Sequence, residues 1–486
     1  MKKERVILGK NCSYSADSKI TGVNNNRVIV GGSGCGKTVS ILEPELLELL
    51  RAGSSNMIVV ATKRRLVDKY RNPLKNAGYT VYDLNFAEPE NSNCCYDPLK
   101  YTKTEEDITD LASAIVLANA KKSNSKMAPF WDDSAISFLT AECAAFLALG
   151  KDCFADVVRF QSSMGIYSAG NAGITTSFDK VMEEAAASRP EYCIEKYWNT
   201  FRENPDRTAR CIYTSLNTAM DKMFTSRICK VMKTRPVIDF QNVANEKSVI
   251  FVTTSPVKKS LHALAQMFIS QAVKELFEIA EKKPSGTLKR PVHISFDDFA
   301  TGGRCANFPE YISIFREKGM SSTILLQSEA QLHQMYGSDA ITILDNCDSY
   351  VYLGGNNIDT AKSISIRLNV PVNEVLHMPV GREIVFRRGQ QPVVTERYDV
   401  FQDEDYRRIT REYQEEVRKS EEVIGRIENR CQSVRRARMN RLLSEESGEG
   451  EKWARRWNRR IKTSRSRGKC DRDVFIRLRK DKDHYR

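Results

Sequence analysis

A glycine-crowded turn near the start of the chain has the residue types that bind phosphate groups. The segment RVIVGGSGCGKTVSILEPE, residues 27–45, passes from a β-branched strand to a helix, and Gly31, Gly36, Lys37 and Thr38 match the pattern G-x-x-x-x-G-K-[ST]. Glycines allow successive backbone N–H groups to turn toward an anion that any Cβ would crowd. The helix that follows adds the positive end of its dipole. The turn therefore predicts a site for a nucleoside triphosphate.

This interpretation gives the residues of the turn separate roles. Lys37 is expected to reach the β and γ phosphates and to act in catalysis, and the Thr38 hydroxyl is expected to ligate Mg²⁺. The alternative is a glycine-rich turn that binds nothing, and the strand before the turn and the helix after it argue against this alternative. The residues predicted to surround the phosphates are Gly31, Gly32, Ser33, Gly34, Cys35, Gly36, Lys37 and Thr38.

Two adjacent acids are the best candidates for the metal and water side of such a site. In PVHISFDDFATGG, residues 291–303, an apolar strand delivers Asp297 and Asp298 at its carboxyl end, where parallel sheets bind their ligands. Asp297 is expected to hold Mg²⁺ through water, and Asp298 to orient the attacking water or accept its proton. Two acids in an ordinary turn are the alternative. The aspartate at the second position is one methylene shorter than a glutamate, and this shorter reach allows slower hydrolysis as an alternative.

Short apolar runs bounded by turn residues predict the strands that must position these groups. Several runs are apolar on successive positions, as strands covered on both faces are, and helix-length segments separate most of them. This pattern predicts an α/β protein with a largely parallel sheet wrapped by helices. The predicted strands are residues 27–30, 57–61, 79–84, 248–254, 292–296, 322–326 and 350–354.

The spacing of the strands predicts the domain organisation. Residues 102–245 have long helical patterns with little strand signal, and they predict an all-helical insertion. The flanking segments, residues 1–101 and 246–400, are expected to form one nucleotide-binding domain. Residues 401–486 begin with a charge-laced helical pattern and end in a basic tail. We expect about the last fifty residues to be poorly ordered or to fold only on a partner.

The net charge of +13 lies mostly in the C-terminal tail. Residues 431–486 hold 19 Lys and Arg against 8 Asp and Glu, so the preceding part of the chain is close to neutral. Within residues 452–480, thirteen Lys and Arg are interleaved with Trp453, Trp457 and Phe475. This composition combines attraction for phosphate with rings that stack on bases or lie among lipid headgroups. It favours sequence-nonspecific DNA as a partner, and generic solubilising charge is the alternative.

Cysteine usage and hydropathy exclude several classes of protein. The thirteen cysteines form no C-x-x-C pair and stand against five histidines, which disfavours a zinc site, and their odd, scattered count is typical of reduced thiols in a cytosolic protein. The N-terminus has no apolar segment of a secretory signal. The most apolar long stretch, residues 135–150, is interrupted by Glu142 and is too short to cross a bilayer. We expect a soluble, cytoplasmic protein.

In five blocks the chain resembles the coupling proteins of type IV secretion and bacterial conjugation, the TraG/TraD-type P-loop ATPases related to FtsK and HerA motors. The resemblance runs from about residue 20 to 400, and the order and spacing of the blocks are more specific than any one block. The blocks are NNNRVIVGGSGCGKT, NSNCCYDPLKY, APFWDDSAISFL, FDDFATGG with FPEYISIFREKGMSSTILLQSEAQLHQMYG, and ILDNCDSYVYLGGNNIDTAKSIS.

The resemblance implies a RecA-like P-loop domain, ATP and Mg²⁺ as cofactors, and a homo-hexamer as the active assembly. It also implies relaxase, relaxosome proteins and components of a type IV secretion channel as partners. Gln327 matches the polar residue that senses the γ-phosphate in such motors, and Arg316 matches a candidate arginine finger that reaches the neighbouring subunit's nucleotide. The alternatives are a strand cap for Gln327 and an ion pair on a helix face for Arg316.

The chain departs from the family pattern at two places. After the second strand the family has an Asp-Pro-Lys-Gly-like turn, whereas VVATKRR, residues 59–65, keeps Lys63 but lacks the acid and the glycine. Family members also carry transmembrane helices ahead of the phosphate loop, and here about 25 residues precede it. Either a separate membrane subunit recruits the protein to the inner face of the cell membrane, or it works without an anchor.

Three functional hypotheses remain, and the first is favoured. In it, ATP hydrolysis pumps a relaxase-bound DNA toward the secretion channel during conjugation. The second is a nucleotide-switched adaptor with weak hydrolysis that delivers nucleoprotein or protein cargo, and the third is a DNA pump of the FtsK or HerA kind. The aromatic residues Phe130, Trp131, Tyr197 and Trp198 of the insertion are expected in the core rather than on a recognition surface.

Overall fold

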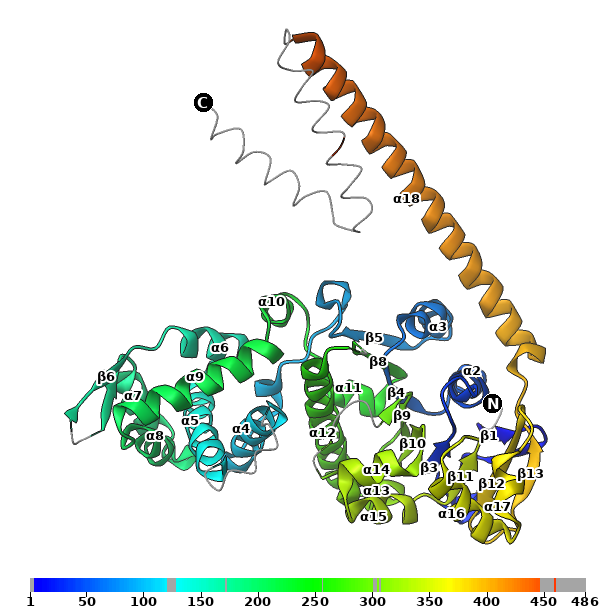
Figure 1. Cartoon of the computed structure of the whole chain (residues 1–486). Helices are drawn as coiled ribbons and strands as arrows, with labels where there is room; N and C mark the ends of the chain where they lie inside the picture. Colours follow the sequence, from blue (N-terminus) through cyan, green and yellow to red (C-terminus); the bar gives the residue numbers. More distant parts are fainter. Residues whose placement is uncertain are drawn as a thin grey trace. The chain divides into compact units, whose positions relative to one another are not determined.

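The computed structural model describes residues 4–119, 128–170, 173–255, 257–299, 304–305, 307–445 and 459. The chain divides into two compact units, Met1–Ile409 and Thr410–Arg486. The first unit contains a nine-stranded sheet and the helices that cover it, together with a helical insertion (Figure 1).

The central sheet has the strand order β13-β12-β11-β3-β10-β9-β4-β8-β5. Seven neighbouring strands, from β11 to β5, run parallel, whereas β12 and β13 join the edge in antiparallel fashion. The predicted α/β fold with a largely parallel sheet is therefore confirmed. The strands are β3 (Arg27–Val30), β4 (Asn56–Ala61), β5 (Thr80–Asn85), β8 (Ser248–Thr253), β9 (Val292–Phe296), β10 (Met320–Leu326), β11 (Ser349–Tyr352), β12 (Arg382–Arg387) and β13 (Val393–Glu396).

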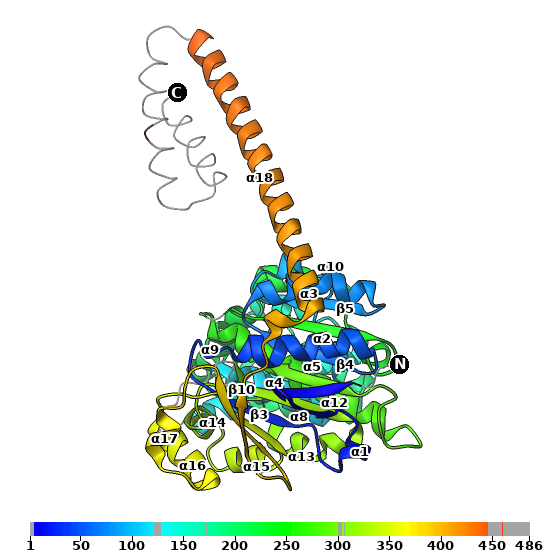
Figure 2. The ribbon, with the colours of Figure 1, turned by 90° about the vertical axis from the view of Figure 1, so that its right-hand side faces the viewer.

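Both faces of the parallel strands are buried, because side chains alternate between two apolar layers. In β4, Met57 and Val59 pack with α2 and α3, whereas Ile58 packs with the layer on the other face. Two views at right angles place α2 and α3 on one side of the strands and α13 and α15 on the other (Figure 1 and Figure 2). The helices that pack around the sheet are α2 (Glu43–Ala52), α3 (Arg64–Asn76), α12 (Lys259–Glu281), α13 (Phe308–Lys318), α14 (Glu329–Tyr336), α15 (Asp339–Asp345), α16 (Ile358–Leu368) and α17 (Val372–Leu376).

A short N-terminal hairpin covers the middle of the sheet. Strands β1 (Arg5–Gly9) and β2 (Cys12–Ser15) pair antiparallel, and the short helix α1 (Ser18–Thr21) follows them. Val6 and Leu8 of β1 pack on Ile29 of β3 and Val351 of β11. The strand that leads into the glycine-rich turn is therefore covered on this face as well.

Among the described residues of the insertion between β5 and β8, one hairpin accompanies the helices. Strands β6 (Ile166–Ser168) and β7 (Ile174–Thr176) pair antiparallel, so the expectation of an all-helical segment is wrong at this point. Three-residue strands are too short for a periodic pattern to reveal them. The helices are α4 (Glu105–Asn119), α5 (Ala128–Ala148), α6 (Phe154–Ser162), α7 (Asp179–Ser188), α8 (Ile194–Arg202), α9 (Asp206–Met223), α10 (Ser226–Thr234) and α11 (Phe240–Asn245).

The aromatic residues of the insertion divide between core and surface. Trp198 is 2% exposed and belongs to the core, where its neighbour Phe201 stacks on Phe138 with ring centroids 4.1 Å apart. Tyr197 is half-buried, and its hydroxyl donates to Glu105. Phe130 is 47% exposed, so the expectation of a core position is wrong for this residue.

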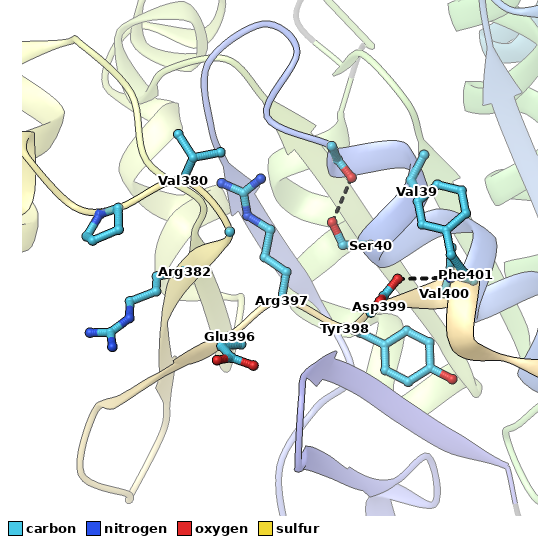
Figure 3. Close-up of a pocket in the computed structure, with 13 residues that line it drawn as sticks. Val39, Ser40, Val380, Arg382, Glu396, Arg397, Tyr398, Asp399, Val400 and Phe401 are labelled. Atoms are coloured by element: carbon cyan, nitrogen blue, oxygen red, sulfur yellow. Dashed lines mark hydrogen bonds between the residues drawn. The ribbon is translucent and has the colours of Figure 1, made fainter.

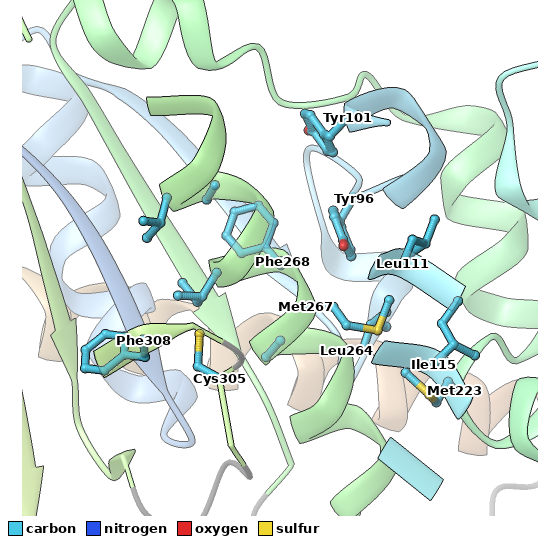
Figure 4. Packing of buried hydrophobic residues seen from close by; sticks show 14 of the residues in the cluster. Tyr96, Tyr101, Leu111, Ile115, Met223, Leu264, Met267, Phe268, Cys305 and Phe308 are labelled. Carbon is cyan, nitrogen blue, oxygen red and sulfur yellow. The ribbon is translucent and has the colours of Figure 1, made fainter. Parts of the chain in front are cut away.

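Helix α12 joins the insertion to the sheet. Leu264 and Met267 of α12 lie opposite Leu111 and Ile115 of α4 (Figure 4), and all four belong to one buried cluster. Polar contacts add to this packing, since Gln271 of α12 accepts from the Tyr96 hydroxyl at 2.6 Å. The insertion is therefore fixed to the same helix that lies beside the sheet.

The long helix α18 (Glu404–Glu445) matches the charge-laced pattern near the C-terminus. It begins in the first unit and continues in the second. The basic tail with Trp453, Trp457 and Phe475 lies outside the described residues. Among the helices of the described part, none combines the length and the apolar character that a membrane span requires.

Candidate nucleotide-binding site

The glycine-rich turn leaves the sheet between two strands that hold its first residues. Gly31 donates its backbone N–H to Leu326 at the end of β10 at 3.1 Å, and Gly32 donates to Gly354 beyond β11 at 3.0 Å. A Cβ on Gly31 would lie 2.5 Å from Cys35 Sγ and 2.8 Å from a side-chain carbon of Leu353, so only glycine fits there.

Two further glycines give the turn its curvature. Gly34 and Gly36 have φ angles of +77° and +82°, in the left-handed region that residues with a side chain rarely adopt. A turn of π-helix, Thr38–Leu42, follows and leads directly into α2. Lys37 stands at its start, and its Nζ donates to the carbonyl oxygens of Gly31 and Gly32 at 2.5 and 3.0 Å. The Lys37 ammonium thus lies beside the first two residues of the loop.

The predicted metal ligands meet beside this loop. Thr38 Oγ1 donates to Asp297 Oδ1 at 2.5 Å, although the two residues come from different elements. Asp297 is 8% exposed, and its backbone N–H donates to Val60 at 2.9 Å, which fixes the carboxyl end of β9 against β4. A threonine hydroxyl and an aspartate carboxylate are oxygen donors of the kind that Mg²⁺ takes in phosphate sites. The residues present therefore fit a magnesium nucleotide.

Asp298 lies next to Asp297 in the chain but lines a different space. Its side chain borders a small cavity of about 10 Å³ together with His262 and Gln266 of α12. The other residues that line this cavity are Val60, Ala61, Thr62, Thr254, Ala265 and Phe296. The two acids thus contribute to two neighbouring parts of the same sheet edge.

Gln327 and Arg316 lie at opposite ends of β10. Gln327 follows the last residue of β10, whose carbonyl accepts from Gly31, so Gln327 is next to the loop. Its backbone N–H donates to the side chain of Gln331 at 3.0 Å. Arg316 is exposed in the last turn of α13, four residues before the start of β10. Since β3 and β10 are parallel, Arg316 lies at the edge of the sheet away from its own loop.

A larger cavity opens on the other side of the loop, beyond Gly36 (Figure 3). It has a volume of about 490 Å³ and is lined by Val39 and Ser40 and by the chain around β13. Arg397 holds this wall to the loop, since its guanidinium donates to Cys35 O and to Leu353 O. The lining residues of that chain segment are Pro379, Val380, Gly381, Arg382, Glu396, Arg397, Tyr398, Asp399, Val400 and Phe401.

The sequence does not predict this wall of the cavity, because its pattern does not predict strands β12 and β13. The apolar run of β12 is only three residues long and is flanked by Arg382, Glu383 and Arg387, and β13 is largely exposed. No motif marks Arg397 either. Between the two strands, the turn residues are Gly389, which has a φ of +75°, and Pro392.

A buried polar network anchors the helix after the loop to the sheet. Glu45 of α2 pairs with Arg27 of β3 at 2.9 Å and accepts from Ser295 and Thr323 at 2.6 Å each. Burial opposes the ionisation of Glu45, but Arg27, His293 and Ser295 together lower its pKa to about 2. The pKa of His293 is lowered by burial and by Arg27. These contacts fix α2, and with it the loop, against β3, β9 and β10.

Comparisons with known proteins agree with this fold and extend it. A family model described as "Type IV secretory system Conjugative DNA transfer" matches residues 2–369. A comparison with curated proteins finds no match. Among solved structures, the bacterial conjugative coupling protein TrwBdeltaN70, in complex with sulphate, is 15% identical with a TM-score of 0.58, over 82% of this chain and 94% of that chain.

Two further structures of the plasmid coupling protein TrwB are similar to the chain. The complex with ADP and Mg²⁺ is 15% identical with a TM-score of 0.57, over 82% of this chain and 90% of that chain. The complex with the ATP analogue ADPNP is 16% identical with a TM-score of 0.55, over 77% of this chain and 85% of that chain. At these identities the likeness establishes a shared fold.

Proposed function

Because the chain belongs to the type IV secretory system conjugative DNA transfer family, we propose that it is a coupling protein that hydrolyses ATP to move DNA toward a secretion channel. The observation that carries the proposal is the contact between Thr38 and Asp297 beside the glycine loop. It brings together two oxygen donors that would hold the magnesium ion of a bound nucleotide, in a chain that matches this family. The nucleotides bound by the TrwB structures support the same assignment.

The residues of the loop have distinct tasks in this proposal. The loop backbone around Gly34 and Gly36 would surround the phosphates, and Lys37 would neutralise charge on the β and γ phosphates. Thr38 and Asp297 would hold Mg²⁺, which supplies charge stabilisation for the transferred phosphoryl group. The ribose and base would enter the 490 Å³ cavity, because Val39 and Ser40 directly follow the phosphate-binding residues and line it.

Three side chains would act on the water and on the leaving phosphate. Asp298 would accept a proton from the attacking water, and Gln327 would sense the γ-phosphate from the end of β10. Arg316 would serve a neighbouring subunit in a homo-hexamer, since it lies away from the loop of its own chain. An arginine finger supplied in this way accelerates phosphoryl transfer by about 10³ to 10⁵-fold.

The cargo and the place of action complete the proposal. The basic tail would hold DNA without reading its sequence, and relaxase and channel components would be the protein partners. The protein would act in the cytoplasm or, through a separate membrane subunit, at the inner face of the cell membrane. A nucleotide-switched adaptor is the second candidate, favoured by one observation: Asp298 borders the cavity beside α12 and is shorter than glutamate.

An ATPase assay with and without DNA separates the two candidates. Wild type is expected to hydrolyse ATP with stimulation by DNA, and Lys37→Ala is expected to lose turnover while keeping its fold. Lys282→Ala, which removes an exposed lysine at the end of α12, is the matched control. Single-stranded and double-stranded DNA are each tested at about 50 and 200 mM salt, since phosphate contacts weaken steeply over this range. Nucleotide binding without turnover under every condition would support the adaptor and overturn the motor.

A further inference from the structure

The small cavity at the carboxyl edge of the sheet has the size and the polar lining of a water site. Its volume of about 10 Å³ corresponds to one water molecule. Asp298, Gln266, His262, Thr62 and Thr254 all border it, so polar groups surround the space on several sides.

Gln266 is the residue that most needs a partner in this cavity. Its side chain is 5% exposed, and its amide oxygen Oε1 has no hydrogen-bond partner among the residues that the structure describes. A buried carbonyl oxygen that loses its water without gaining another donor destabilises a fold. Ordered water satisfies such groups where the site is polar and large enough.

The surroundings of Gln266 are held in place by backbone contacts. Thr254 donates its N–H to Ala61 at 3.1 Å, and Asp297 donates to Val60 at 2.9 Å, which aligns the ends of β8, β4 and β9. His262 is hydrogen-bonded through Nε2 to the carbonyl oxygen of Ser255. The walls of the cavity are therefore fixed around Asp298.

We propose that this cavity holds one water molecule, which donates one hydrogen bond to Gln266 Oε1 and the other to the carboxylate of Asp298. Gln266 is then a positioning residue for ATP hydrolysis, and this role rests on the proposed function. The held water is distinct from the attacking water. It orients Asp298, the residue proposed to accept the proton of the attacking water.

Kinetics of the full-length chain test the positioning role. Gln266→Leu keeps the side-chain volume but removes the acceptor for the held water. We expect kcat to fall about tenfold while KM and nucleotide affinity stay unchanged, because the change acts on the proton acceptor and not on the loop.

Gln271→Leu is the matched control on the same helix. Gln271 accepts from Tyr96 and donates to Pro98 O at 3.0 Å, so its loss weakens the packing of the insertion. We expect this variant to lower stability while leaving kcat unchanged. A kcat that falls equally in both variants, or in neither, overturns the positioning role.

A crystal structure of the full-length chain tests the water directly. We expect ordered density within hydrogen-bond distance of Gln266 Oε1 and Asp298 in wild type, and its loss in Gln266→Leu. A dry cavity in a protein that hydrolyses ATP overturns this inference alone. A wild-type protein without turnover overturns the proposed function, and the positioning role of Gln266 falls with it.

Discussion

Thr38 and Asp297 lie 259 positions apart in the chain, yet the hydroxyl of the first donates to the carboxylate of the second at 2.5 Å. The contact exists because β3 and β9 are both parallel neighbours of β10, so the residues that follow them emerge at one edge of the sheet. The two oxygen donors of the proposed magnesium site are thus brought together by the topology of the sheet.

The first prediction concerns the metal dependence of nucleotide binding. We expect Asp297→Asn to weaken ATP affinity about 10 to 100-fold in the presence of Mg²⁺, because the variant lacks the charge that would hold the hydrated ion. In EDTA, wild type and variant should bind equally, since the loop backbone is intact. Fluorescent nucleotide titrations with and without Mg²⁺ measure both values. An equal loss in EDTA would show that Asp297 shapes the loop and has no metal role.

The second prediction concerns the first glycine of the loop. In Gly31→Ala the new Cβ would meet Cys35 Sγ and Leu353, so the loop must shift. A displacement of about 1 Å at a phosphate site lowers turnover about 10²-fold, and we expect a loss of this size in the ATPase assay. Gly150→Ala is the control, since it has a φ of +70° and open space around the Cβ. The control should cost about 1 to 2 kcal/mol of stability and leave turnover unchanged.

The third prediction concerns the buried network under the loop. Glu45→Gln leaves Arg27 buried without its partner charge, and breaking a buried pair in this way costs about 3 to 5 kcal/mol of unfolding free energy. The folded protein holds the pKa of Glu45 at about 2, below its ordinary value, so its ionised form stabilises wild type above about pH 5. This stabilisation is lost as the pH falls toward 2.

Urea denaturation across this pH range measures the effect. The difference in unfolding free energy between wild type and Glu45→Gln should be constant from pH 7 to about pH 5 and should shrink at lower pH. A difference that stays constant down to pH 3 would mean that Glu45 does not act through its charge.

The fourth prediction concerns the wall of the larger cavity. Arg397→Met removes the donors to Cys35 O and Leu353 O, and hydrogen bonds from charged groups contribute about 1.5 to 3 kcal/mol. We expect ATP affinity to fall about tenfold because the loop is held less firmly. Arg382→Met, which changes a residue lining the same cavity, is the control. Equal affinities for the two variants would contradict the bracing role of Arg397.

The sequence predicted the elements whose signals are local. The parallel strands were visible because both faces of each are buried, which produces runs such as VIV and VIFVT. The glycine spacing and the paired acids were also local patterns, and the structure brings Thr38 and Asp297 together as that interpretation requires.

The residues that the sequence did not reveal depend on distant packing. Gln266 lies within an ordinary amphipathic helix and becomes notable only because α12 sets it beside Asp298. Arg397 follows a largely exposed edge strand, and its contact with Cys35 joins segments 362 positions apart. The sequence pattern gives no signal for such pairs, because the residues that flank Gln266 and Arg397 form no recognisable motif.

The fifth prediction concerns the assembly and uses Arg316. This residue is exposed at the edge of the sheet away from its own loop, so the proposed arginine finger would act on a neighbour's site. We expect Arg316→Ala to bind ATP normally and to lose turnover by about 10³-fold or more. Lys37→Ala should lack turnover for a different reason, because its own loop no longer neutralises the phosphates.

Mixing the two inactive proteins then distinguishes action between subunits from action within one. In a mixed ring, some interfaces combine an intact loop from the Arg316→Ala chain with an intact Arg316 from the Lys37→Ala chain. Turnover should therefore reappear on mixing, with a maximum near equal amounts of the two chains. A mixture that stays inactive, although sizing shows mixed assemblies, would show that Arg316 does not act on a neighbour's site, because these interfaces would restore a finger supplied by the neighbour.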